Sequence, residues 1–223
     1  MIAVKVERVL KQYKMGKVMI DALKGVDLEV AQGEIICIMG PSGSGKTTLL
    51  NIIGGIDYAQ SGKVYIYGED ITRFNDTALS DFRNRFLGFI FQSFNLIPVL
   101  TAFENIEYPL LLQKVSKNER RKKVSEIMEM IGLAEYKNHK PDELSGGQRQ
   151  RVAIGRALIT KPKMVVADEP TANLDHETGK NIMELIKDMN VTMNTTFIFS
   201  SHDMFVTSYA NRIVNIIDGR ILN

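Results

Sequence analysis

Two kinds of hydrophobic pattern divide this chain. Residues 35–39 form a short, wholly apolar run, which is typical of a strand buried on both faces. Residues 46–53 carry apolar side chains at helical spacing and are followed by a glycine pair, so we expect a helix that ends there. Strands are also expected at residues 63–67 and 86–91. The first third therefore combines several strands with one early helix.

The pattern becomes helical from about residue 93 to residue 151. Val124, Ile127, Met128 and Ile131 fall on one helix face. After this stretch, apolar runs alternate with a helix whose inward positions are centred on residues 182–189. The strands expected in this last part span residues 164–168, 195–200 and 212–217. Such alternation predicts a largely parallel sheet covered by helices.

Composition and charge narrow the class of protein. The chain has 223 residues, 44% of them hydrophobic, which suits a folded α/β domain with an insertion. Its net charge of +2 is too small to bind nucleic acid or an anionic membrane by charge alone, so no nucleic-acid partner is expected. The lone Cys37 lies in an apolar run, which indicates a buried structural thiol in a reducing compartment.

The sequence also predicts where the chain works. Charged residues interrupt the first twenty positions, so no signal peptide is expected. No stretch approaches the roughly 18 apolar residues needed to cross a bilayer. We therefore expect a cytoplasmic chain whose membrane work, if any, is done by a partner.

Residues 40–47 carry the strongest chemical signal. They match GxxxxGK(S/T) and lie between the strand expected at 35–39 and the helix expected at 46–53. Glycines let the backbone N–H groups turn toward phosphate oxygens, and the helix dipole adds positive charge. Lys46 supplies a full charge to the β- and γ-phosphates, and Thr47 offers a hydroxyl ligand for Mg²⁺.

Two carboxylates follow the buried strand expected at residues 164–168. The parallel-sheet rule places this strand end beside the phosphate loop. Asp168 is then expected to complete the Mg²⁺ shell, and Glu169 to polarise the attacking water. Together with the loop, this pair predicts a nucleoside triphosphatase.

A second anion-binding helix terminus is expected after residues 144–148, Leu-Ser-Gly-Gly-Gln, with the helix running from Arg149 onward. One triphosphate does not need two such sites. The economical arrangement is two chains facing head to tail, each offering this terminus to the γ-phosphate held by the other. ATP would then join the two chains, and hydrolysis would release them.

These three motifs resemble the ATPase subunit of an ABC transporter over nearly the whole chain. The resemblance implies an α/β, P-loop NTPase fold of the ABC ATPase type, with a mostly parallel sheet core, an N-terminal antiparallel β subdomain and an inserted helical subdomain. It implies one domain over residues 1–223, with a nucleotide-binding core at 1–92 and 152–223 and the helical insertion at 93–151. ATP and Mg²⁺ are the implied cofactors.

The expected site residues fall into three groups. The catalytic residues are Glu169 and, from the resemblance, the switch histidine His202. The metal ligands are Thr47, Gln92 and Asp168. The nucleotide-binding residues are Tyr13, which the resemblance implies stacks on adenine, with Gly40, Pro41, Ser42, Gly43, Ser44, Gly45, Lys46, Thr47, Thr48, Gln92, Ser145, Gly146, Gly147, Gln148 and, in the dimer-facing loop, Asp175.

Three further segments, at residues 92–98, 104–106 and 171–175, resemble the branch with lipoprotein-releasing and macrolide- or peptide-exporting transporters. That resemblance implies a transmembrane permease partner of few spans, an ATP-dependent homodimer, and a position on the inner face of the cell membrane through the partner. The alternatives are the ATPase of an ABC importer and a soluble ABC ATPase. The cargo is not readable from the sequence.

Two surface features leave alternatives open. The basic run at residues 117–123 is either the solvated start of a helix or a contact for a partner or lipid headgroups. Six apolar residues near the start of the insertion form either a socket for a partner's helix or part of the core. They are Phe94, Leu96, Ile97, Val99, Leu100 and Phe103.

Overall fold

The buried strands form one six-stranded sheet in the computed structural model, which describes residues 1–222. The strands are β3 (Ile35–Met39), β6 (Leu87–Ile90), β7 (Met164–Asp168), β8 (Thr196–Ser201), β9 (Arg212–Ile217) and β10 (Arg220–Leu222). Their order is β10-β9-β3-β8-β7-β6, and only β10 runs antiparallel to its neighbour. The predicted mostly parallel sheet core is confirmed.

Side-chain alternation along these buried strands divides the core in two. Ile35 and Cys37 point into a cluster formed with the helices of one face, whereas Ile36 and Ile38 point into a cluster on the opposite face. All four side chains are 3% exposed or less. A strand buried on both sides has no polar face, which explains the uninterrupted apolar run.

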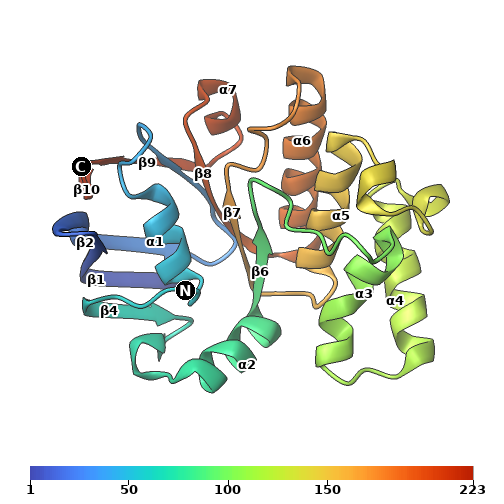
Figure 1. Cartoon of the computed structure of the whole chain (residues 1–223), viewed down its shortest axis with the longest axis horizontal. Helices are drawn as coiled ribbons and strands as arrows, with labels where there is room; N and C mark the ends of the chain where they lie inside the picture. Colours follow the sequence, from blue (N-terminus) through green and yellow to red (C-terminus); the bar gives the residue numbers. More distant parts are fainter. Residues whose placement is uncertain (223) are drawn as a thin grey trace.

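A four-stranded antiparallel sheet covers one face. Its order is β2-β1-β4-β5, with bounds β1 (Ile2–Met15), β2 (Val18–Ala31), β4 (Ser61–Ile66) and β5 (Glu69–Asp70). Helix α1 (Lys46–Ile53) is packed between this sheet and the central one, as Figure 1 shows. The expected antiparallel β subdomain is present, although the sequence pattern did not mark its two long N-terminal strands.

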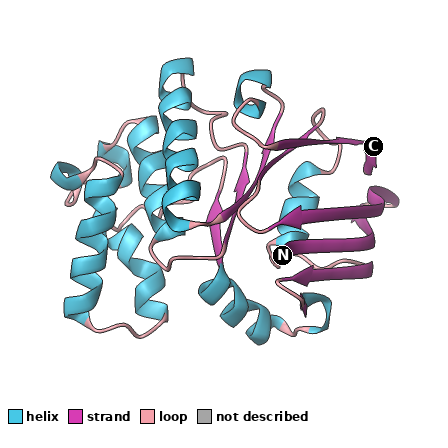
Figure 2. Cartoon of the chain, turned by 180° about the vertical axis from the view of Figure 1, so that it is seen from behind, coloured by secondary structure: helices cyan, strands magenta, loops and turns pink. Residues whose placement is uncertain are grey.

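Helices cover the other face. They are α3 (Ala102–Leu112), α4 (Lys117–Met130), α5 (Gly146–Leu158) and α6 (His176–Met193), seen together in Figure 2 on the side away from the antiparallel sheet. The remaining elements are α2 (Asp76–Phe86), α7 (Met204–Thr207) and the 3-10 turns η1 (Ile71–Arg73), η2 (Ala134–Tyr136) and η3 (Pro141–Glu143). No helix within residues 1–222 is long and apolar enough to span a membrane.

Several element boundaries differ from the prediction. Helix α5 begins at Gly146 rather than Arg149, because the Ser145 side chain caps it and Gln148 completes a capping box. Phe86 ends α2 rather than starting the next strand. The strands expected at 63–67 and 195–200 span residues 61–66 and 196–201.

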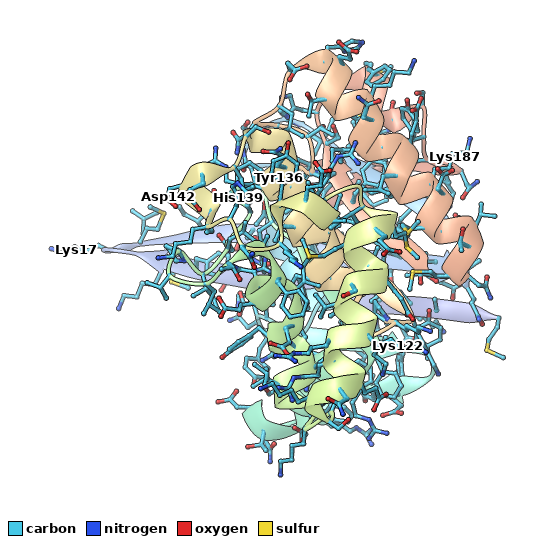
Figure 3. The ribbon with its side chains drawn as sticks, turned by 90° about the vertical axis from the view of Figure 1, so that its right-hand side faces the viewer. Lys17, Lys122, Tyr136, His139, Asp142 and Lys187 are labelled. Atoms are coloured by element: carbon cyan, nitrogen blue, oxygen red, sulfur yellow. The ribbon has the colours of Figure 1, made fainter. Side chains whose placement is uncertain are left out.

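The insertion shares its core with the central sheet. Residues of α3, α4 and α5 belong to the same buried cluster as β7 and β8. The basic run starts α4, and Figure 3 shows Lys122 on its outer surface. Arg120 and Lys123 pair with Glu107 and Glu119 at 2.8 Å, so part of this run is neutralised within the chain.

The six apolar residues near the start of the insertion are neither wholly core nor wholly exposed. None of them is fully buried, and Val99 is 75% exposed. Leu96 and Phe103 pack against the helix-side core. The group therefore contributes to the core at one edge while leaving apolar surface at the other.

Candidate active site

The loop between β3 and α1 requires glycine at two positions. A Cβ on Gly40 would lie 2.1 Å from the carbonyl oxygen of Ile216, which is closer than any real contact. Gly45 has φ +105° and directly precedes α1, in a conformation that L side chains rarely adopt. The loop is thus fixed against β9 and the helix start, and its backbone N–H groups are available to an anion.

Lys46 is held inside this loop. Its side chain is 6% exposed, and Nζ donates hydrogen bonds to the carbonyl oxygens of Gly40 at 2.8 Å and Pro41 at 3.0 Å. The hydroxyl of Ser44 is buried and has no hydrogen-bond partner among residues 1–222. A buried ammonium whose hydrogen bonds go to neutral carbonyl oxygens and a buried hydroxyl without a partner are both groups that a phosphate oxygen satisfies.

The acidic strand end meets the phosphate loop, as predicted. The hydroxyl of Thr47 donates to Oδ2 of Asp168 at 2.9 Å, although the two residues are 121 positions apart. Ser200 on β8, the strand between β3 and β7, donates from Oγ to Oδ1 of Asp168 at 2.6 Å. Both carboxylate oxygens of Asp168 are therefore oriented by hydroxyl groups.

Glu169 lies between a cation and a histidine. Its Oε1 lies 4.0 Å from Nζ of Lys46 and 3.1 Å from Nδ1 of His202. The backbone of Glu169 has φ +44°, which is uncommon for a residue other than glycine, and its N–H donates to Oγ of Ser200 at 3.0 Å. This turn directs the carboxylate toward the phosphate loop.

The residues at this point suit Mg²⁺. Mg²⁺ prefers hard oxygen ligands, and Thr47 and Asp168 supply a hydroxyl and a carboxylate oxygen at adjacent positions. Gln92 is not joined to them by any hydrogen bond among residues 1–222. Instead its backbone carbonyl accepts from Nδ2 of Asn173 at 2.8 Å, and the side chain is exposed.

The second predicted anion site lies across the sheet. Helix α5 belongs to the helix-side cluster, whereas α1 belongs to the opposite one. No hydrogen bond or ion pair among residues 1–222 joins 145–148 to the phosphate loop. Gly147 instead packs on α6, since a Cβ there would lie 2.5 Å from the γ-methyl group of Thr178.

Asp175 begins helix α6 beside this second site. Its side chain accepts a hydrogen bond from the backbone N–H of Thr178 at 3.0 Å, and these contacts hold the pKa of Asp175 below its ordinary value. Within one chain Asp175 is therefore an exposed helix cap.

Tyr13 lies near the start of α1. Its hydroxyl donates to Oδ2 of Asp57 at 2.6 Å and is close to the side chain of Thr48. Burial and the hydrogen bond to Asp57 raise the pKa of Tyr13. The side chain is 37% exposed, so the ring is accessible to a ligand.

Sequence patterns missed two residues that orient the site. Ser200 orients Asp168 and the backbone of Glu169, and its only signal is a hydroxyl at the end of a buried strand next to the acidic one. Asp57 follows the glycine pair after α1 and carries no motif. Both are recognisable only from their partners in space.

Comparison with known proteins agrees with this geometry. A family model described as "ABC transporter" matches residues 23–172. The chain is 47% identical to an uncharacterized ABC transporter ATP-binding protein of Thermotoga maritima, over 96% of this chain and 91% of that one. It is 43% identical to the lipoprotein-releasing system ATP-binding protein LolD of Geobacter metallireducens, over 95% of this chain and 94% of that one.

Solved structures show the same architecture. A dimeric structure of the ATP-binding cassette MJ0796, in a post-hydrolysis state bound to ADP and Pi, superposes with a TM-score of 0.92. It is 46% identical and covers 99% of this chain and 97% of its own. The protein MJ0796 comes from Methanocaldococcus jannaschii.

Proposed function

Since the chain belongs to the ABC transporter family and is an ATP-binding, ATP-hydrolysing subunit, we propose that two copies close head to tail around two MgATP molecules and thereby drive a separate membrane subunit. Closure is the power stroke, and hydrolysis reopens the pair.

The separation of the two anion sites carries this proposal. The phosphate loop opens α1 on one side of the central sheet, and Ser145 to Gln148 open α5 on the other. No hydrogen bond or ion pair among residues 1–222 brings the α5 terminus to the phosphate loop of the same chain. A second chain in a two-fold arrangement supplies that terminus to both sites at once.

Within each chain, the residues around the phosphate loop perform the chemistry. Lys46 and the loop N–H groups bind the phosphates, while Mg²⁺ held by Thr47 and Asp168 would neutralise phosphate charge. Glu169 accepts a proton from the attacking water, and His202 donates a hydrogen bond toward the γ-phosphate or to Glu169. Gln92 would reach the metal only after a movement of its loop.

The membrane subunit is proposed from the relatives. LolD belongs to a lipoprotein-releasing system, which supports extraction or export rather than import. The chain would then lie on the cytoplasmic face of the cell membrane, attached to that partner through the insertion. The alternatives remain an importer ATPase and a soluble ABC ATPase, and purification of the tagged chain from membranes with its bound proteins separates them.

The experiment for closure uses Glu169→Gln. This variant keeps ATP binding but loses the base, so we expect a stable dimer in saturating MgATP by sedimentation velocity. Lys46→Ala should remain monomeric because it loses phosphate affinity. If Glu169→Gln sediments as a single chain both alone and with its membrane partner, head-to-tail closure is wrong.

A matched pair of cap variants tests the second site. Ser145→Ala should prevent dimerisation in the Glu169→Gln background while leaving ATP binding to monomers intact. Ser116 caps α4 in the same way but lies outside the site, so Ser116→Ala controls for the loss of a helix cap, which costs about 1 kcal/mol. Equal effects of both variants on dimerisation would contradict the role of Ser145.

A further inference from the structure

We propose that Asp57 is a positioning residue that orients the Tyr13 ring for adenine. The inference rests on the proposed stacking role of Tyr13 and adds to it the group that fixes the ring. Asp57 belongs to none of the nucleotide motifs of the chain.

Both carboxylate oxygens of Asp57 are used in this contact. Oδ2 accepts the Tyr13 hydroxyl at 2.6 Å, and Oδ1 accepts the Lys11 ammonium at 2.6 Å. Oδ1 also accepts the backbone N–H of Tyr58 at 2.7 Å, and Lys11 donates to the carbonyl oxygen of Tyr58 at 2.8 Å. Charge-assisted bonds of this kind are stronger than neutral ones, so the three side chains form one ordered unit.

The unit is attached to the helix that begins with the phosphate-binding lysine. The backbone N–H of Asp57 donates to the carbonyl oxygen of Asn51 in α1, and the Tyr13 hydroxyl also lies near Thr48, two residues after Lys46. Helical residues rise about 1.5 Å each, so the contact between Tyr13 and Thr48 lies within the first turn of α1. The position of the ring is therefore fixed relative to the phosphates.

Lys11 and Asp57 also fix the orientation of the Tyr13 ring. The Lys11 ammonium lies 5.0 Å from the centroid of the Tyr13 ring. The cation is attracted to the π electrons of the ring, and the ring stays exposed enough to contact a planar base. Burial favours the neutral acid, but the hydrogen bonds from Lys11 and Tyr13 outweigh it and hold the pKa of Asp57 below its ordinary value.

The test compares ADP with inorganic pyrophosphate by calorimetry on the full-length chain, because only ADP carries adenine. We expect Asp57→Ala to weaken ADP binding roughly five- to tenfold, which is the effect of losing one ordinary hydrogen bond, and to change pyrophosphate binding less than twofold. Tyr13→Phe should weaken ADP binding similarly, and the double variant should be no weaker than either. Asp57→Asn, which keeps an acceptor for the hydroxyl, should lose less than threefold.

Two comparisons keep the outcomes distinct. Asp76 accepts a hydrogen bond from the Tyr58 hydroxyl without touching Tyr13, so Asp76→Asn is the matched control and should leave both affinities unchanged. If Tyr13→Ala weakens ADP selectively but Asp57→Ala does not, the positioning role is wrong and the stacking role stands. If Tyr13→Ala itself leaves the ratio of ADP to pyrophosphate affinity unchanged, the stacking role fails. Equal losses for both ligands in Asp57→Ala would also overturn the inference.

Discussion

The Ser200 hydroxyl connects the carboxylate of Asp168 to the backbone N–H of Glu169, so its removal should affect both stability and turnover. In Ser200→Ala, Oδ1 of Asp168 loses a donor and the N–H of Glu169 loses an acceptor. The side chain of Ser200 is fully buried. The variant therefore perturbs the metal ligand and the base in one step.

The magnitude follows from these two hydrogen bonds. A hydrogen bond to a charged group contributes roughly 1.5–3 kcal/mol, and a buried N–H left without a partner costs about 1–3 kcal/mol. We expect a loss near the low end of the sum of these two terms, about 2–3 kcal/mol in the free energy of unfolding. For a chain of this length that corresponds to a fall in Tm of roughly 4–12 °C.

The assays are thermal unfolding and steady-state ATP hydrolysis. Misplacement of Asp168 and Glu169 should raise the activation free energy of hydrolysis by about 1–2 kcal/mol, so kcat should fall roughly five- to thirtyfold. Thr195→Val is the matched control, because Thr195 directly precedes the other end of β8 and its hydroxyl donates to the carbonyl oxygen of Pro162. It should lower stability by about 1 kcal/mol and leave kcat unchanged. An unchanged kcat in Ser200→Ala would refute the orienting role.

Three other predictions test the surroundings of the site. Burial opposes ionisation of Glu34, but hydrogen bonds from Arg212 and a backbone N–H hold its pKa below its ordinary value. Glu34→Gln should therefore reduce stability to urea at pH 7, and the difference should vanish as the pH falls through that lowered pKa. Gly147→Ala should cost about 1–3 kcal/mol of unfolding free energy by crowding Thr178, and Thr178→Ala should restore it. Burial raises the pKa of the Cys37 thiol to about 12. Iodoacetamide at about pH 8 should therefore label only the unfolded chain, as detected by mass spectrometry. Rapid labelling of the native chain would contradict the burial of Cys37.

Local sequence determined the elements whose signals are contained within a few residues. The helix expected at residues 46–53 and the strands expected at 164–168 and 212–217 have those bounds in the structure. Each is an apolar pattern ended by glycine or by charge, so its limits depend on neighbouring residues alone. The positions of Lys46, the first residue of α1, and of Asp168, the last residue of β7, were predictable for the same reason.

Two other boundaries depend on side-chain capping and on strand pairing rather than on the apolar pattern. Two glycines at the start of α5 have low helix propensity, which favoured a start at Arg149, but the capping box of Ser145 and Gln148 extends the helix to Gly146. The strand Ile2–Met15 pairs with two neighbours and carries several register shifts, which disturb its alternating pattern. Its length is set by those neighbours rather than by its own residues.

The sequence by itself determined the chemistry of the phosphate loop, because glycine, lysine and threonine at fixed spacing act through one turn of backbone. Only the tertiary structure decided that Ser200 joins Asp168 to Glu169, that Asp57 holds Tyr13, and that Ser145 lies across the sheet from Lys46. These relations join residues from different strands and helices, and their geometry exists only once both cores are packed on the two faces of the central sheet.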